Sequence, residues 1–347
     1  MLCFLAYPNP GTNTYIIGTQ NPYILIDTAE GLPSYIPILS SALKSTGQPY
    51  DPSKPDVSDI VISHWHPDHI GGSPDVLRLL KDLWNARNEG QQYSPPLLHK
   101  YTIRRGSEGR HNSILQKVLE QLPVGLYAPA ADGSAFHDLQ DGQVFKDSSG
   151  ATLFRVLHTP GHTVDSVALH FPTDKALYTA DTVLGHGTTV FEDLSEYLTS
   201  LKRLQALGSR DSDPITATCE YTVLYPGHGP VVANGRETIS TYIQHRLDRE
   251  QEILKVLKSP TPPVLRENPN PAVKQDDVHW TTWNIVRIIY EKYPESLWLP
   301  ACHSVELHLL KLQKDGIVHR VAGDGPQTLW KLASSKGSFA HYPRIII

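Results

Sequence analysis

Residues 58–69 read Ser-Asp-Ile-Val-Ile-Ser-His-Trp-His-Pro-Asp-His, so an apolar run leads directly into a cluster of polar side chains. The run from Ser58 to Ser63 has the length and composition of a buried β-strand. Three histidines and one aspartate follow it within residues 64–69. In α/β proteins, ligands bind at the C-terminal ends of strands and in the loops that follow. The stretch therefore predicts an α/β fold with a functional site directly after this strand.

The spacing of these four polar residues predicts a site for two metal ions. His64 and His66 are two residues apart, and on an extended segment such residues share a face, so both can bind one ion. The turn through Pro67 then directs Asp68 and His69 toward a neighbouring ion. Imidazole and carboxylate ligands together favour zinc, iron or manganese, and zinc is the default without redox chemistry. The alternative is a cluster that arises by chance or serves structure only.

The flanking sequence predicts strands and helices of an α/β domain. Two β-rich runs, 15–17 and 23–27, flank a Gly-Thr-Gln-Asn-Pro turn and predict a hairpin. Residues 1–6 are too short and lack the basic start of a signal peptide, which predicts a first strand instead. Further strands are predicted at 153–157 and 167–171, and helices at 34–45, 194–207 and 237–257.

A proline-rich break at residues 259–263 predicts the end of this first domain. The chain is then expected to divide into a catalytic domain at 1–258 and a smaller domain at 259–347. The order of elements in the second domain resembles a winged helix. Its predicted elements are helices at 280–293 and 305–314 and a two-stranded wing at 317–321 and 328–332.

Residues 81–125 are polar and dotted with glycine and proline, which predicts an insertion in the catalytic domain. Two interpretations stay open for it. It is either a surface loop or a lid over the site.

Composition excludes several classes of protein. The 347 residues are 39% hydrophobic and 19% charged, with no apolar run long enough to span a membrane. The three cysteines lie far apart and form no metal-binding pair, which suits a reducing interior and predicts a cytoplasmic protein. A formal net charge of −5 argues against a strongly electrostatic nucleic-acid binder.

The motif His64-x-His66-x-Asp68-His69 resembles the HxHxDH hallmark of the metallo-β-lactamase superfamily. This resemblance implies an αββα sandwich of two sheets with two metal ions at one edge. It also implies three further ligands in a fixed order along the chain. They are His162 within Thr-Pro-Gly-His-Thr, Asp181 after the strand at 176–180 as the bridging ligand, and His228 within Pro-Gly-His-Gly.

Each of these further assignments has a structural alternative. His162 and His228 could be turn histidines that bond to the backbone, and Asp181 could cap a helix. Residues 9–15 and Asp27 also resemble the N-terminal part of proteins in this family. Asp27 is expected either to orient a metal-binding histidine or to cap a turn. His186 and Tyr225 are expected to line the pocket.

The expected mechanism follows from the two-metal ligand set. Two metal ions lower the pKa of a shared water and polarise the oxygen of the electrophile. Asp68 is then expected to orient the resulting hydroxide and to take its proton. Because this chemistry serves thioesters, lactones, other esters, β-lactams and phosphodiesters alike, the ligands predict the reaction class and leave the substrate open.

A narrower resemblance covers residues 182–194, the turn at 225–230 and the helix around His245, and it points to the lactamase-like branch with a C-terminal winged-helix-like domain. That branch includes fungal thioesterases that release polyketides from an acyl carrier protein and an animal endoribonuclease for single-stranded RNA. We expect an acyl thioester as substrate, because a thiolate leaves without a dedicated general acid and an acidic chain gains nothing from a polyanion. RNA cleavage is the main alternative, and hydrolysis of another small ester, lactone or β-lactam is a further one. The second domain is expected to be a docking appendage.

Overall fold

The computed structural model describes most of the chain. Within the described part, no helix is both long and apolar enough to cross a membrane. The described residues are 2–5, 11–45, 50–102, 110–147, 149–209, 216–260 and 279–333.

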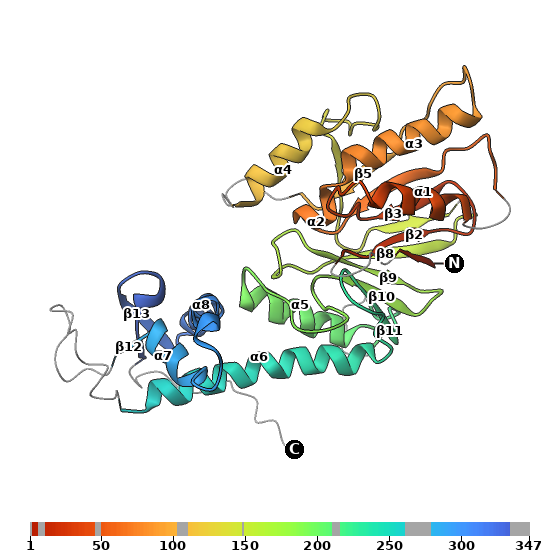
Figure 1. The fold of residues 1–347 in the computed structure, drawn as a ribbon. Coiled ribbons are helices and arrows are strands. Elements are labelled where there is room, and N and C mark those ends of the chain that lie inside the picture. Colours follow the sequence, from red (N-terminus) through yellow and green to blue (C-terminus); the bar gives the residue numbers. More distant parts are fainter. Residues whose placement is uncertain are drawn as a thin grey trace. The chain divides into compact units, whose positions relative to one another are not determined.

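The first sheet has six strands and carries the N-terminal part of the fold (Figure 1). Its first three strands are antiparallel, and its last three run parallel to β3. The predicted hairpin is confirmed, because β2 and β3 pair directly. In sheet order the strands are β1 (Leu2–Leu5), β2 (Thr14–Ile17), β3 (Tyr23–Ile26), β4 (Val57–Ile62), β5 (Leu97–Lys100) and β6 (Phe136–Asp138).

The second sheet has five strands and carries the next part of the chain. All of its neighbours are antiparallel except β10 and β11, which are parallel. Both β9 and β10 are buried along their whole length, as expected of strands covered on both faces. In chain order the strands are β7 (Val144–Lys146), β8 (Thr152–His158), β9 (Val167–Phe171), β10 (Ala176–Ala180) and β11 (Val223–Pro226).

The two sheets pack face to face with helices outside them, which confirms the predicted αββα sandwich. One core lies between the sheets and includes Ile26, Val61 and Leu169, all fully buried. A second core lies between the first sheet and its helices, where Leu39 and Leu77 are fully buried. Full burial of each such side chain stabilises the folded state by roughly 1.5–3 kcal/mol. The helices of this unit are α1 (Tyr35–Ser45), α2 (Pro67–Ile70), α3 (Ser73–Arg87), α4 (Arg110–Gln121), α5 (Leu194–Ala206) and the start of α6 (Gly235–Lys258).

The expected insertion at residues 81–125 is wrong. Its first residues complete α3, where Leu80 and Trp84 are buried at helical spacing. Strand β5 then lies inside the first sheet, parallel to β4 on one side and to β6 on the other. Helix α4 packs on the same core through Val118 and Leu122. This segment is therefore part of the sandwich, apart from residues 103–109, which lie outside the described part.

The C-terminal unit has its own core and a small sheet. Trp280 and Trp330 are buried side by side across β12 and β14, and the Trp330 indole donates a hydrogen bond to Thr282. The predicted wing is confirmed as the pair β13–β14, and the predicted second helix is longer than expected. The elements are β12 (Trp280–Thr281), α7 (Thr282–Ile289), α8 (Trp298–Lys314), β13 (Val318–Ala322) and β14 (Leu329–Leu332).

The division between the two units falls inside α6. The chain forms two compact units, residues 1–243 and 244–347, whereas the sequence predicts a boundary at residue 259. The physical reason is that Ile253 and Leu257, in the second half of α6, pack into the C-terminal core. The proline-rich break that suggested a linker falls largely on residues 261–278, which lie outside the described part.

Candidate metal centre

Strand β4 and the short helix after it deliver the first four candidate ligands. Ile62 ends the strand, and His64 and His66 follow in extended backbone. Pro67 then occupies the first turn of α2, a position where its missing N–H costs nothing. The helix turns the chain back, so Asp68 and His69 point to a different place than His64 and His66. The structure places His64 and His66 in one group and Asp68 and His69 in another, as their spacing predicted.

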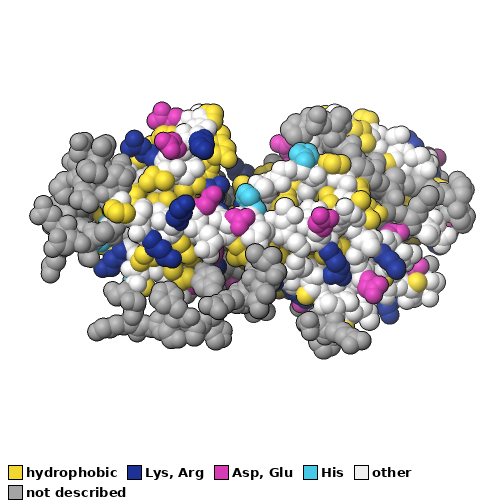
Figure 2. All heavy atoms as spheres, turned by 90° about the horizontal axis from the view of Figure 1, so that it is seen from below, with side chains coloured by type: hydrophobic (Ala, Val, Ile, Leu, Met, Phe, Trp, Pro, Cys, Tyr) yellow, Lys and Arg dark blue, Asp and Glu magenta, His cyan; other side chains and the backbone are white. Residues whose placement is uncertain are grey.

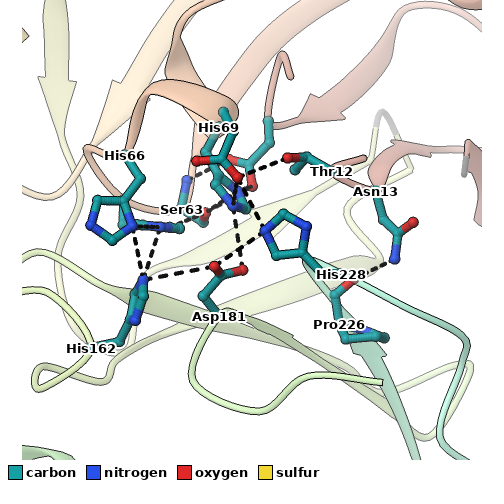
Figure 3. Close-up of polar contacts among 12 residues, drawn as sticks. Thr12, Asn13, Ser63, His66, His69, His162, Asp181, Pro226 and His228 are labelled. Atoms are coloured by element: carbon teal, nitrogen blue, oxygen red, sulfur yellow. Dashed lines mark hydrogen bonds and ion pairs between the residues drawn. The ribbon is translucent and has the colours of Figure 1, made fainter. Parts of the chain in front are cut away.

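The first group consists of three imidazoles that face a common point (Figure 3). His64 Nε2 lies 3.0 Å from His66 Nδ1 and 3.2 Å from His162 Nε2. His162 Nε2 is also 3.0 Å from His66 Nδ1. The third member comes from the loop between β8 and β9. Residues 98 positions apart in the chain are therefore brought to hydrogen-bonding distance.

The second group combines two imidazoles with Asp68 (Figure 3). His228 Nε2 lies 3.1 Å from Asp68 Oδ2, and His69 Nε2 lies 3.5 Å from the same oxygen. His228 follows β11, so the second sheet supplies one member and the first sheet the other two.

Asp181 lies between the two groups. Its Oδ1 is 3.3 Å from His69 Nε2, and its Oδ2 is 3.3 Å from His228 Nε2 and 3.8 Å from His162 Nε2. It follows the end of β10, and Ala180 before it adopts a left-handed φ of 45°, which an alanine rarely does. Strained backbone of this kind gathers at functional sites. One carboxylate thus faces both groups.

The donor atoms fit divalent metal ions. With Zn–N bonds of ~2.0–2.1 Å, tetrahedral ligands lie ~3.3 Å apart, close to the separations in both groups. Two of the facing atoms, His69 Nε2 and Asp181 Oδ1, lie 3.3 Å from each other and are buried with no hydrogen bond among the described residues. Buried polar atoms without partners are rare and indicate an ion or a function. The seven residues proposed from the sequence are therefore positioned for metal binding.

The electrostatics of the first group favour neutral imidazoles. Burial lowers the pKa of His64 well below its usual value and that of His66 to about 4, and the neighbouring imidazoles add to the effect for both. Burial also lowers the pKa of His162. A neutral imidazole nitrogen is the form that binds a metal. This group is ready to accept an ion without first losing a proton.

The electrostatics of the second group are set by carboxylates in contact with its two imidazoles. Burial raises the pKa of Asp68, but the hydrogen bond with His228 and the charge of His69 outweigh it, so the pKa falls well below its usual range. Conversely, burial lowers the pKa of His228, but the hydrogen bonds to Asp181 and Asp68 outweigh it and raise the pKa to about 10. Without an ion, protons on these imidazoles balance the carboxylates. A divalent cation bound there would balance the negative charge of the carboxylates in the same way.

Asp27 is buried beside the centre and contacts one of its histidines. Its Oδ2 lies 2.7 Å from His69 Nδ1, which turns Nε2 toward the second group. The carboxylate also accepts hydrogen bonds from Ser63 N at 2.7 Å, from Ser63 Oγ at 2.8 Å and from the Tyr178 hydroxyl. Ser63 Oγ lies 3.0 Å from His64 Nδ1 as well. Ser63 and Tyr178 were not identified from the sequence.

Backbone carbonyls orient the two histidines of the second sheet. His162 Nδ1 donates to the carbonyl of Val190 at 2.8 Å, and His228 Nδ1 donates to the carbonyl of Gly11 at 3.1 Å. Each bond fixes the tautomer in which Nε2 carries the lone pair. Gly227 is required beside them, because a Cβ there would lie 2.3 Å from Asp181 Oδ1.

A small pocket opens beside the second group. Glu30 is exposed, and Leu32 is 45% exposed, so both are accessible at its mouth. Neither Lys nor Arg lies among its lining residues within the described part of the chain. Its lining residues are Gly11, Thr12, Ala29, Glu30, Leu32, Tyr35, Asp68 and His228.

The two other pocket residues expected from the sequence lie elsewhere. Tyr225 is half-buried and packs against Tyr15 in the core between the sheets, with ring centroids 5.8 Å apart. His186 is exposed, and its ring lies close to Gly229, where an added Cβ would meet Nδ1 at 2.4 Å. Neither lines the pocket beside Asp68 and His228.

Comparison with known families agrees with this fold and this set of residues. Residues 8–228 match the family described as Metallo-beta-lactamase superfamily, and residues 281–332 match the Beta-lactamase associated winged helix domain. The chain therefore belongs to the metallo-β-lactamase superfamily of metal-dependent hydrolases. Within it, this chain has the form that carries a winged helix after the catalytic domain.

Two relatives and one solved structure illustrate the similarity. The Beta-lactamase-like protein 2 homolog of Caenorhabditis elegans is 33% identical over 314 residues, which are 89% of this chain and 80% of that protein. Lactamase-like protein nscB of Trichophyton rubrum is 31% identical over 323 residues, 92% of this chain and 80% of that protein. A Beta-lactamase domain protein from Burkholderia ambifaria has a TM-score of 0.62 at 18% identity, covering 96% of this chain and 91% of its own, and it supports the fold alone.

Proposed function

We propose that this chain is a dinuclear zinc hydrolase that cleaves an acyl thioester. The observation that carries the choice of substrate is the pocket beside Asp68 and His228, whose described lining includes the exposed residues Glu30 and Leu32 and contains neither lysine nor arginine. Such a lining suits an uncharged, partly apolar substrate. A polyanion would meet the Glu30 carboxylate there, with no lysine or arginine in the described lining to bind the rest of its charge.

Two zinc ions held by the seven residues would supply hydroxide at neutral pH and positive charge for the carbonyl oxygen of the substrate. Asp68 is the residue of the chain that handles the proton. Its Oδ2 faces His228, whereas no described residue donates a hydrogen bond to Oδ1. Because the pKa of Asp68 is low, its carboxylate is ionised, and Oδ1 can orient the attacking water and accept its proton.

The leaving group of a thioester needs little help from the protein. A thiol has a pKa of ~8.5, so a thiolate departs at neutral pH without a dedicated acid. The alkoxide of an RNA ribose is far more basic and calls for a general acid. We propose that the thioester is presented on the phosphopantetheine arm of an acyl carrier protein, a thin chain that suits a narrow pocket.

The winged-helix match favours one other function, a metal-dependent endoribonuclease, because winged helices often bind nucleic acid. Charge argues against it. On the face drawn in Figure 2, acidic and basic side chains are interspersed over the described surface and form no continuous basic stripe there. The full chain has a net charge of −5. Single-stranded RNA is held by positively charged grooves.

One assay separates the two functions. Purified protein is incubated with an acyl N-acetylcysteamine thioester and, separately, with labelled single-stranded RNA, each with and without a chelator. We expect thioester turnover that the chelator abolishes and that moderate salt changes little. RNA cleavage with a steep salt dependence, and no turnover of thioesters, would overturn the proposal. A His64→Ala variant, prepared in the same way, controls for contaminating nucleases.

A further inference from the structure

The segment Gly11–Asn13 clamps one side of the metal centre. The Gly11 carbonyl accepts the hydrogen bond from His228 Nδ1 at 3.1 Å, and Thr12 Oγ1 donates to Asp68 Oδ2 at 3.0 Å. Asn13 fixes the turn that carries His228, because its side chain donates to the carbonyls of Pro226 at 3.0 Å and Gly229 at 2.8 Å. Its backbone N–H donates to the Gly227 carbonyl at 2.7 Å. Thr12 and Asn13 are 5% and 3% exposed.

All of these bonds reach the second group and none reaches the first. Within the described part of the chain, the side-chain bonds of Thr12 and Asn13 go to Asp68 and to the turn around His228. The outer nitrogen of His162 is held instead by Val190 and Thr189. His64 is held by Ser63. The N-terminal segment therefore supports only the second group, whereas Ser63 and Asp27 contact histidines of both groups.

We infer that Thr12 is a positioning residue that fixes the rotamer of Asp68. Its hydroxyl bonds to Oδ2, the same oxygen that lies 3.1 Å from His228 Nε2. This bond holds Oδ2 toward the second ion and leaves Oδ1 for the reacting water. Loss of the hydroxyl frees the carboxylate to rotate about its Cβ–Cγ bond, a torsion with no sharp preference of its own. The second ion then loses a well-placed ligand and the water loses its oriented acceptor.

Thr12→Val tests this inference, because valine keeps the shape of threonine and removes the hydroxyl. Zinc binding is measured stepwise by competition with a chromophoric chelator, which gives a separate association constant for each of the two ions. We expect the association constant of one ion, that of the second group, to fall about 10- to 100-fold, the usual effect of removing an outer hydrogen bond to a ligand. The association constant of the other ion should stay within about twofold. Where thioester is turned over, kcat should fall by a similar factor with little change in KM.

Two further variants give the experiment its controls. Thr12→Ser keeps the hydroxyl, so both of its association constants for zinc should equal those of the wild type. Thr14→Val makes the same chemical change two residues along, at a fully buried threonine whose hydroxyl accepts from Tyr35 at 2.9 Å, so it should affect stability and leave zinc binding alone. If Thr12→Val fails to fold, Thr12→Ala is measured in its place.

The inference rests on the proposed two-metal centre and not on the choice of substrate. A wild-type chain that binds only one zinc ion contradicts the centre itself, and Thr12 then has no second ion to serve. A wild-type chain that binds two, with Thr12→Val equal to Thr12→Ser, overturns the role of Thr12 alone. Equal weakening of both ions by Thr12→Val would also overturn it, because a general structural defect would explain that result.

Discussion

Asp68 combines two tasks at the scale of a single residue, as a candidate ligand and as the proton acceptor. Asp68→Asn separates them, because the amide keeps an oxygen that can accept from Thr12 but cannot take a proton from water at neutral pH. We expect kcat to fall by ~10²–10⁴ while most of the zinc remains bound. Metal content and turnover are measured on the same sample, with His64→Ala as the variant that loses metal. Turnover of Asp68→Asn at the native rate would rule out the proton-acceptor role.

The individual ligands could be predicted more readily than the residues around them. His64 and Asp68 belong to one short motif, so their spacing alone indicated two sites. Ser63 and Thr12 support the centre through partners that only folding brings close, 36 residues away for Ser63 and 56 for Thr12. Tyr225 precedes the turn that carries His228, and its partner in the structure is Tyr15 at the core between the sheets, which its place in the sequence does not indicate.

Helix α8 carries a titratable group that makes the C-terminal unit sensitive to acid. His308 is fully buried, and burial lowers its pKa to about 3, with the charges of Arg246 and Arg249 acting in the same direction. The folded pKa lies below the unfolded value of ~6.5, so the stability that neutral His308 provides is complete above pH ~6.5. It is lost as the pH falls from ~6.5 toward ~3, by up to ~1.4 kcal/mol per pH unit.

His308→Gln tests this sensitivity by removing the titration. Between pH 7 and pH 5, the wild-type unit should lose ~2 kcal/mol more free energy of unfolding than the variant. Urea unfolding followed by tryptophan fluorescence reports mainly on this unit, because four of the six tryptophans of the chain lie in it. Equal losses in both proteins would show that His308 does not cause the pH dependence. The four are Trp280, Trp283, Trp298 and Trp330.

Elements with strong periodicity could be predicted from the sequence, and short ones surrounded by polar residues could not. Strand β4 and helix α5 were evident from their apolar patterns. Strand β5 has only four residues, which follow a pair of prolines and show no alternation of apolar and polar side chains. Residues 81–125 therefore resembled an insertion. Its place in the sheet is set by pairing with β4 and β6, which are distant in the chain.

At the scale of the whole molecule, the sandwich brings together candidate ligands from both sheets. The first sheet supplies His64, His66, Asp68 and His69, and the second supplies the other three, so the centre requires the two halves to pack correctly. The motif order indicated this architecture from the sequence. The division inside α6 could not be foreseen, because the helix pattern continues unbroken through residue 243.

Metal content measured together with activity tests the central claim most directly. The two groups of residues predict that elemental analysis of purified, active protein finds about two zinc ions per chain. Stepwise removal with a chelator should abolish hydrolysis, and added zinc should restore both the ions and the activity. A fully active sample that contains no transition metal would contradict the account.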